Sequence, residues 1–142
     1  MKKSLLSSIV FIAFAVIAYG QKMDASKVPE AVKASFAKLH PGMTPKWEKE
    51  NGKYEALFKL NGNAASATFD ANGKLEEGEE NIKVSDLPAT IQKYLTDHYK
   101  GKKIKEAAKI TLPDGTVQYE AQVNDKDLIF DASGKFLKET KE

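Results

Sequence analysis

The chain has 142 residues, and its 22 basic and 20 acidic side chains leave a net charge of +2 at pH 7. Every basic residue is a lysine and there is no cysteine, so the chain offers neither a bidentate arginine fork nor a disulfide. Nucleic acid is disfavoured as a partner, because its recognition needs clustered basic charge.

The N-terminus has the pattern of a secretory signal peptide. Lys2 and Lys3 precede an apolar run over residues 5–18, and small residues surround a cleavage site after Gly20. The run is shorter than the ~20 residues that cross a bilayer. We therefore predict a signal peptide over residues 1–20 and a mature chain, 21–142, that is periplasmic or secreted, with no stable membrane insertion after cleavage.

The first half of the mature chain reads as a helix followed by strands. Helical spacing of apolar residues predicts a helix over 26–39, capped by Ser26. Apolar and polar residues then alternate in three strands, separated by turns at 51–52 and 61–63. After a turn at 69–75, a weaker strand is predicted up to Ile82. Its four glutamates indicate a solvated sheet edge: Glu76, Glu77, Glu79 and Glu80.

The second half repeats this order. A helix begins near Leu87-Pro88, with Ser85 or Asp86 as its cap, and ends before Gly101. A strand with Ala108 and Ile110 on its buried face follows. Further strands are predicted over 117–123, around 128–130 and around Phe136, with a turn over 131–134.

Matching segments indicate an internal duplication. Tyr54-Glu55-Ala56 corresponds to Tyr119-Glu120-Ala121, and Phe69-Asp70-Ala71 to Phe130-Asp131-Ala132. We predict one domain over 21–142 made of two tandem repeats, about 26–83 and 84–142. Because such a repeat buries little apolar surface alone, the predicted fold is α+β: two helix-plus-antiparallel-strand repeats form one joint antiparallel sheet, with both helices packed on one face.

The residues point to no catalytic, cofactor-binding or metal site. His40 and His98 are the only histidines, each near the end of a predicted helix, and no nucleophile motif is present. The turn 70–73 has the acidic character of a calcium loop. Its counterpart at 131–134 does not share the remaining ligand types, so we interpret both as turns that connect strands. We predict that the protein is not an enzyme.

Strand alternation singles out one face of the predicted sheet. If Tyr54, Ala56 and Phe58 face the helices, their neighbours point to the other face. The candidate protein-binding residues on that face are Lys46, Glu48, Glu55, Leu57, Lys59, Gln118, Glu120 and Gln122. The same alternation predicts that Lys105, Lys109 and Ile129 are exposed there. The alternative is that this face is only the solvated side of an antiparallel sheet.

The helix starts at Val28-Pro29 and Leu87-Pro88, together with the Tyr-Glu-Ala strand and the Phe-Asp-x-x-Gly-Lys turn that each occur twice, resemble the PepSY-like family, which is also described as β-lactamase-inhibitor-like. The resemblance covers the chain from about Val28 to its end. It implies an exported α+β module of a bacterium of the Bacteroides group, with a role in binding or inhibiting other proteins such as peptidases.

These observations lead to two functional hypotheses. The first is a non-enzymatic exported module that binds an unidentified protein partner through the sheet face, as an inhibitor or modulator of an envelope or secreted protein. The second, motivated by the acidic run and the Asp-Asn turn, is an envelope carrier of a small ligand or a cation.

Overall fold

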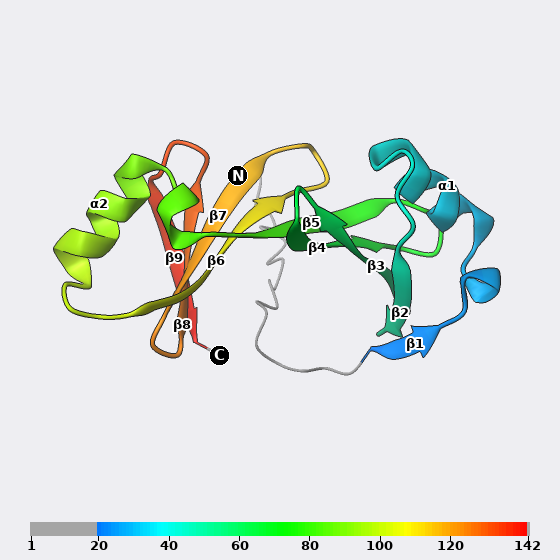
Figure 1. Cartoon of the computed structure of the whole chain (residues 1–142), viewed down its shortest axis with the longest axis horizontal. Coiled ribbons are helices and arrows are strands. Elements are labelled where there is room, and N and C mark those ends of the chain that lie inside the picture. Colours follow the sequence, from blue (N-terminus) through cyan, green and yellow to red (C-terminus); the bar gives the residue numbers. More distant parts are fainter. Residues whose placement is uncertain (1–19, 142) are drawn as a thin grey trace, which may run out of the picture.

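The computed structural model describes residues 20–141, so the predicted signal peptide lies outside the described residues. Within them, nine strands form one antiparallel sheet in which every strand pairs with its neighbours in the sequence (Figure 1). The strands are β1 (Gln21–Met23), β2 (Lys46–Glu50), β3 (Lys53–Leu60), β4 (Asn63–Phe69), β5 (Leu75–Ile82), β6 (Ile104–Thr111), β7 (Val117–Val123), β8 (Lys126–Asp131) and β9 (Phe136–Lys141). The α+β class is confirmed.

Both α-helices begin one residue after a proline, later than the sequence suggested. Helix α1 (Glu30–Leu39) follows Pro29 and helix α2 (Ala89–His98) follows Pro88, and neither has a side-chain cap. Proline fits a helix start because its φ is fixed near the helical value and it has no N–H to leave unpaired.

The predicted caps belong instead to short 3₁₀ helices before each α-helix. Ser26 lies in η1 (Ala25–Lys27), where its backbone N–H donates to the carboxylate of Asp24 over 2.8 Å. Ser85 and Asp86 lie in η2 (Val84–Asp86). The capping predictions for Ser26, Ser85 and Asp86 were therefore wrong, because a separate turn precedes each proline.

The two helices cover opposite ends of the sheet and build two separate cores (Figure 1). Around α1, the buried residues are Val28, Val32, Phe36, Trp47, Tyr54, Ala56, Ala67 and Phe69. Around α2, they are Leu87, Ile91, Leu95, Ala107, Ala121, Val123, Leu128 and Phe130. Apolar burial of this kind is the main favourable term in folding, at roughly 25 cal/mol per Å².

Strand β5 joins these two cores. It pairs with β4 on one side and β6 on the other, so that Glu79 lies between Ser66 and Ile110. The glutamate-rich strand is thus central, and the prediction that it forms a solvated edge was wrong. The local charge pattern suggested an edge, but the two neighbouring strands satisfy its backbone groups.

The side chains of strand β6 face the opposite sides of the sheet from those predicted. Ala107 packs in the α2 core, which places Ala108 and Ile110 on the other side of the sheet. Lys109 pairs with Tyr119 and so lies on the α2 side, while Lys105 falls within an irregularity of register between Ile104 and Glu106. A bulge of this kind shifts strand alternation by one residue.

The two aspartate turns have the same hydrogen bonding. Asp70 Oδ1 accepts from the backbone N–H groups of Asn72 and Lys74, both over 2.9 Å. Asp131 Oδ1 accepts from those of Ser133, over 2.9 Å, and Lys135, over 3.0 Å. Their interpretation as turns that connect strands is confirmed, since each carboxylate is occupied by its own backbone.

The glycine of each turn lies against a helix. Gly73 has φ +82°, and a Cβ there would overlap the backbone oxygen of Ala31 in α1. Gly134, with φ +88°, would meet Thr90 of α2, whose hydroxyl donates to the carbonyl of Ser133 over 3.1 Å. The turns therefore fix how closely each helix approaches the sheet.

The Gly73→Ala variant separates this close approach from the cost of a positive φ. Gly62 has φ +84° and open space around it, so Gly62→Ala should cost only about 1–2 kcal/mol for the left-handed backbone. Gly73→Ala should cost about 1–3 kcal/mol more, because the new methyl group meets a backbone atom. Urea unfolding monitored through Trp47 measures both; equal losses would show that the turn does not determine helix packing.

Candidate functional site

The register of the sheet places the eight candidate residues on one side, which we call the candidate face. Lys46 lies opposite Leu57, and Glu48 opposite Glu55. From Leu57 a row continues across the sheet through Ser66, Glu79, Ile110 and Gln118. The alternation of each strand adds Lys59, Glu120 and Gln122. Their role in binding stays a prediction.

The second half of this face is more buried than predicted. Glu120 and Gln122 are 7% and 6% exposed, and Ile129 is 1% exposed. These residues lie on β7 and β8. Lys46 and Lys59, nearer the other end, are exposed. The accessible part of the candidate face is therefore centred on β2 to β5.

Residues of β4 and β5 complete the face and were not among the sequence candidates. They are Ser66, Glu77, Glu79 and Asn81, which the register and alternation place beside Glu55 and Leu57. Reading β5 as an edge hid Glu77 and Glu79. The alternation of Glu77 and Glu79 with Glu76 and Glu80 indicates that the two pairs face opposite sides of the sheet. It identifies the candidate face only when the strands beside β5 are known.

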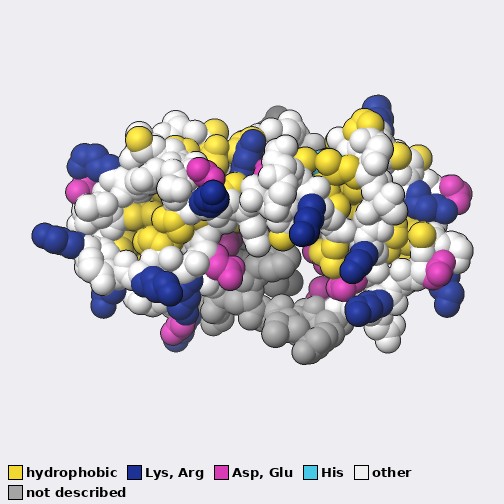
Figure 2. All heavy atoms as spheres, in the orientation of Figure 1, with side chains coloured by type: hydrophobic (Ala, Val, Ile, Leu, Met, Phe, Trp, Pro, Cys, Tyr) yellow, Lys and Arg dark blue, Asp and Glu magenta, His cyan; other side chains and the backbone are white. Residues whose placement is uncertain are grey.

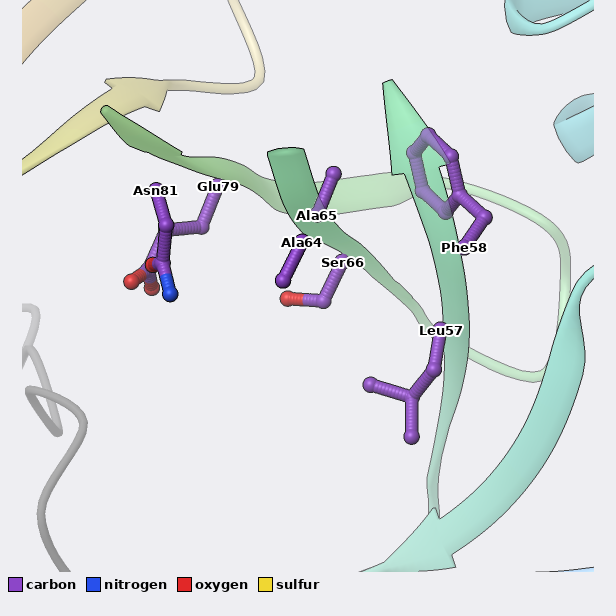
Figure 3. Close-up of a pocket in the computed structure, with 7 residues that line it drawn as sticks. All are labelled: Leu57, Phe58, Ala64, Ala65, Ser66, Glu79 and Asn81. Carbon is purple, nitrogen blue, oxygen red and sulfur yellow. The ribbon is translucent and has the colours of Figure 1, made fainter. Parts of the chain in front are cut away.

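A pocket of about 240 Å³ opens beside these residues. Figure 3 shows the side chains of Leu57, Ala64 and Ser66 pointing to the same side of the sheet as those of Glu79 and Asn81. Phe58 and Ala65 complete the lining. The pocket thus combines an apolar floor with a carboxylate and an amide.

Burial and like charge raise the pKa values of the carboxyl groups around the pocket. For Glu79, burial is the larger cause and the carboxylates of Glu120, Glu77, Glu55 and Glu106 add to it, which raises its pKa to about 8. Burial and the charge of Glu55 raise the pKa of Glu77 to about 7. The pKa of Glu55 is raised chiefly by burial, although a hydrogen bond with Ser66 opposes the shift. The centre of the face therefore favours protonated carboxyl groups.

Both histidines occupy helix ends, as predicted, and pack against aromatic rings. His40 follows the last residue of α1 and lies 5.3 Å from Phe36 and 4.5 Å from Phe58, measured between ring centroids. Burial lowers its pKa. His98 stacks on Tyr94 at 4.0 Å, and its Nδ1 lies 3.0 Å from the Tyr94 carbonyl oxygen.

Residues 20–141 contain neither a metal-binding cluster nor a membrane-spanning helix. No group of three or more His, Cys, Asp or Glu side chains in that range is placed to hold a metal ion. No helix in that range is long and apolar enough to cross a membrane.

The sequence over residues 52–138 matches the PepSY-like, beta-lactamase-inhibitor-like family. The chain belongs to this PepSY-like family. The match covers β3 to β8, includes α2 and ends within β9. The resemblance seen in the repeated motifs is thereby confirmed. Comparison with curated proteins gives no match.

Several crystal structures share the fold. A BLIP-like protein from Bacteroides fragilis is 23% identical, with a TM-score of 0.73 over 80% of this chain and 86% of that one. A DUF2874 family protein from Bacteroides ovatus is 20% identical, with the same TM-score and coverage. A protein from Bacteroides eggerthii, described as periplasmic, is 15% identical, with a TM-score of 0.72 over 80% of this chain and 88% of that one. At these identities the likeness establishes the fold alone.

The raised pKa of Glu79 predicts that stability falls as pH rises. The folded state holds the Glu79 proton up to pH about 8 and the unfolded state only up to about 4.5, so the free energy of unfolding should decrease between those values. Glu79→Gln should remove much of this decrease and stabilise the protein by at least ~1 kcal/mol at pH ~8.

Chemical denaturation at a series of pH values measures this effect. The matched control is Glu80→Gln on the other face of β5, where the Glu80 carboxylate accepts a hydrogen bond from Asn63 over 3.2 Å. It should leave the pH dependence as in the wild type. If Glu79→Gln also leaves it unchanged, the buried carboxyl at position 79 is not its source.

Proposed function

We propose that this protein is an exported, non-enzymatic module that binds a protein partner through the candidate face. The observation that carries the proposal is that this face presents charged side chains and an apolar pocket together, away from both helix-covered cores. Such a combination suits a protein interface, where an apolar centre gives affinity and surrounding charge gives specificity.

The architecture we propose is a duplicated unit whose two helices pack on one face of the joint sheet. The register supports it. Ala65 lies two residues from Ala67 of the α1 core and therefore on the same side of the sheet. From Ala65 the paired positions run through Glu80 and Lys109 to Tyr119, which packs against the α2 core. The identical hydrogen bonding at Asp70 and Asp131 supports duplication. Two helices on one side would leave the candidate face as the broad binding surface.

Export and the non-enzymatic role have separate support. Lys2, Lys3 and the apolar run over 5–18 support a signal peptide cleaved after Gly20, and the Bacteroides eggerthii neighbour is described as periplasmic. The inhibitor-like description of the family and the BLIP-like neighbour support action on another protein. We therefore propose that this protein is periplasmic or secreted and acts as an inhibitor or modulator of an envelope or secreted protein.

Photo-crosslinking in the native envelope tests the binding face. A photoreactive amino acid at the exposed positions Lys46 or Lys59 should give one discrete protein adduct, because both lie on the candidate face. The matched controls are the exposed helix positions Lys38 and Lys93, which should not give it. The same adduct from all four positions, or from the helix positions alone, would place the interface elsewhere.

Calcium addition distinguishes this proposal from a cation carrier. The carboxylates of Asp70 and Asp131 each accept two backbone N–H groups, so millimolar calcium should leave the melting temperature unchanged. A cation bound at 100 times its Kd would stabilise the fold by about 2.7 kcal/mol, which thermal unfolding readily detects. A dose-dependent rise in melting temperature would favour the carrier.

A further inference from the structure

We propose that the pocket on the candidate face receives an apolar side chain of the partner, flanked by lysine or arginine in the same segment. This inference rests on the proposed protein-binding function and adds the chemistry of the segment that is bound.

The size of the pocket favours a single side chain. At about 240 Å³ it is smaller than the roughly 300–1,000 Å³ typical of sites for small molecules and cofactors. The apolar side chains that point to the pocket's side of the sheet are those of Leu57 and Ala64, whereas Phe58 and Ala65 line it from strands whose side chains point to the other side there (Figure 3). An apolar side chain placed there would be removed from water against an apolar surface, as anchor residues of protein interfaces are.

Carboxyl groups lie beside the pocket on the side of β5, and they are negatively charged once ionised. Glu79 is part of the lining, and the charges that act on its carboxyl group are those of other glutamates: Glu120, Glu77, Glu55 and Glu106. Lys46 and Lys59 lie toward the opposite side, on β2 and β3, and are exposed. Figure 2 shows lysine and acidic side chains interspersed over the view that it draws.

A cationic side chain would complement this arrangement. Carboxylates held close together and partly removed from water are costly when ionised, and an approaching ammonium or guanidinium group offsets that cost. A lysine or arginine without a neighbouring contact would not be held beside these carboxyl groups. An apolar neighbour in the pocket would anchor it over β5, so that the two contacts select the same segment.

Defined peptides test this with the mature protein. The probe is an amidated pentapeptide with a central leucine flanked by lysines, compared with one in which glutamates replace the lysines and one in which glycine replaces the leucine. NMR titration should give shifts at Leu57, Ala64 and Asn81, with about tenfold weaker binding for either altered peptide. Binding of the lysine peptide should tighten from pH ~6 to ~8, because ionised Glu79 is the form that attracts the cation.

Two pairs of variants separate the contacts. Ala64 and Ala71 are both exposed, but only Ala64 lines the pocket; Ala64→Leu should weaken binding about tenfold and Ala71→Leu should not change it. Glu79→Gln should reduce the preference for lysine over glutamate peptides, and Glu80→Gln should retain it. Circular dichroism of each variant verifies that it is folded.

The inference is overturned if the three peptides bind equally, if none binds at millimolar concentration, or if Ala64→Leu has no effect. Its failure is distinguishable from that of the proposed function. A discrete adduct from Lys46 or Lys59 without peptide selectivity would retain the binding face and reject the basic-apolar segment. Absence of both results would reject the face itself.

Discussion

The pairing of β5 with β6 is the interaction on which the rest of the structure depends. Each helix packs on its own group of strands, and the two apolar cores share no buried residue. Backbone hydrogen bonds between Leu75–Ile82 and Ile104–Thr111 therefore carry the continuity of the nine-stranded sheet. Because a unit of this size buries little of its surface alone, we propose that the ladder joins the two halves into one cooperative domain.

The same ladder concentrates glutamates where the two halves meet. In an isolated strand, Glu77 and Glu79 would be hydrated and ionised; placed between β4 and β6, their side chains share one face with Glu55 and Glu120. Burial and mutual repulsion then raise the pKa values of Glu77 and Glu79 to about 7 and about 8. Buried carboxyl groups with raised pKa values destabilise the fold when they ionise, and natural proteins tend to retain them at functional sites. This favours the candidate face over the helices as the site of binding.

The helices owe their positions to the turns at Asp70 and Asp131. Each aspartate binds its own backbone, and each following glycine allows a helix to approach where a side chain would not fit. An acidic turn that resembles an ion-binding loop in sequence thus acts as a spacer between helix and sheet. Both aspartate carboxylates accept hydrogen bonds from the backbone of their own turns.

The sequence by itself determined both α-helices, the strands from β2 to β9, the family motifs and most of the core, but neither β1 nor the two 3₁₀ helices. Period-two alternation identified β3 and β7, proline and glycine marked the helix ends to within a few residues, and the eight candidate residues fall on one side of the sheet. Local patterns sufficed there because each strand has one apolar side. Only the tertiary structure decided that β5 is central, that Ala107 rather than Ala108 faces α2, and that Ser66 and Glu79 complete a pocket. Those features depend on which strands are neighbours and on a bulge that changes which side of the sheet the following side chains face. A local pattern of charge or hydrophobicity contains no information on strand neighbours or on the bulge.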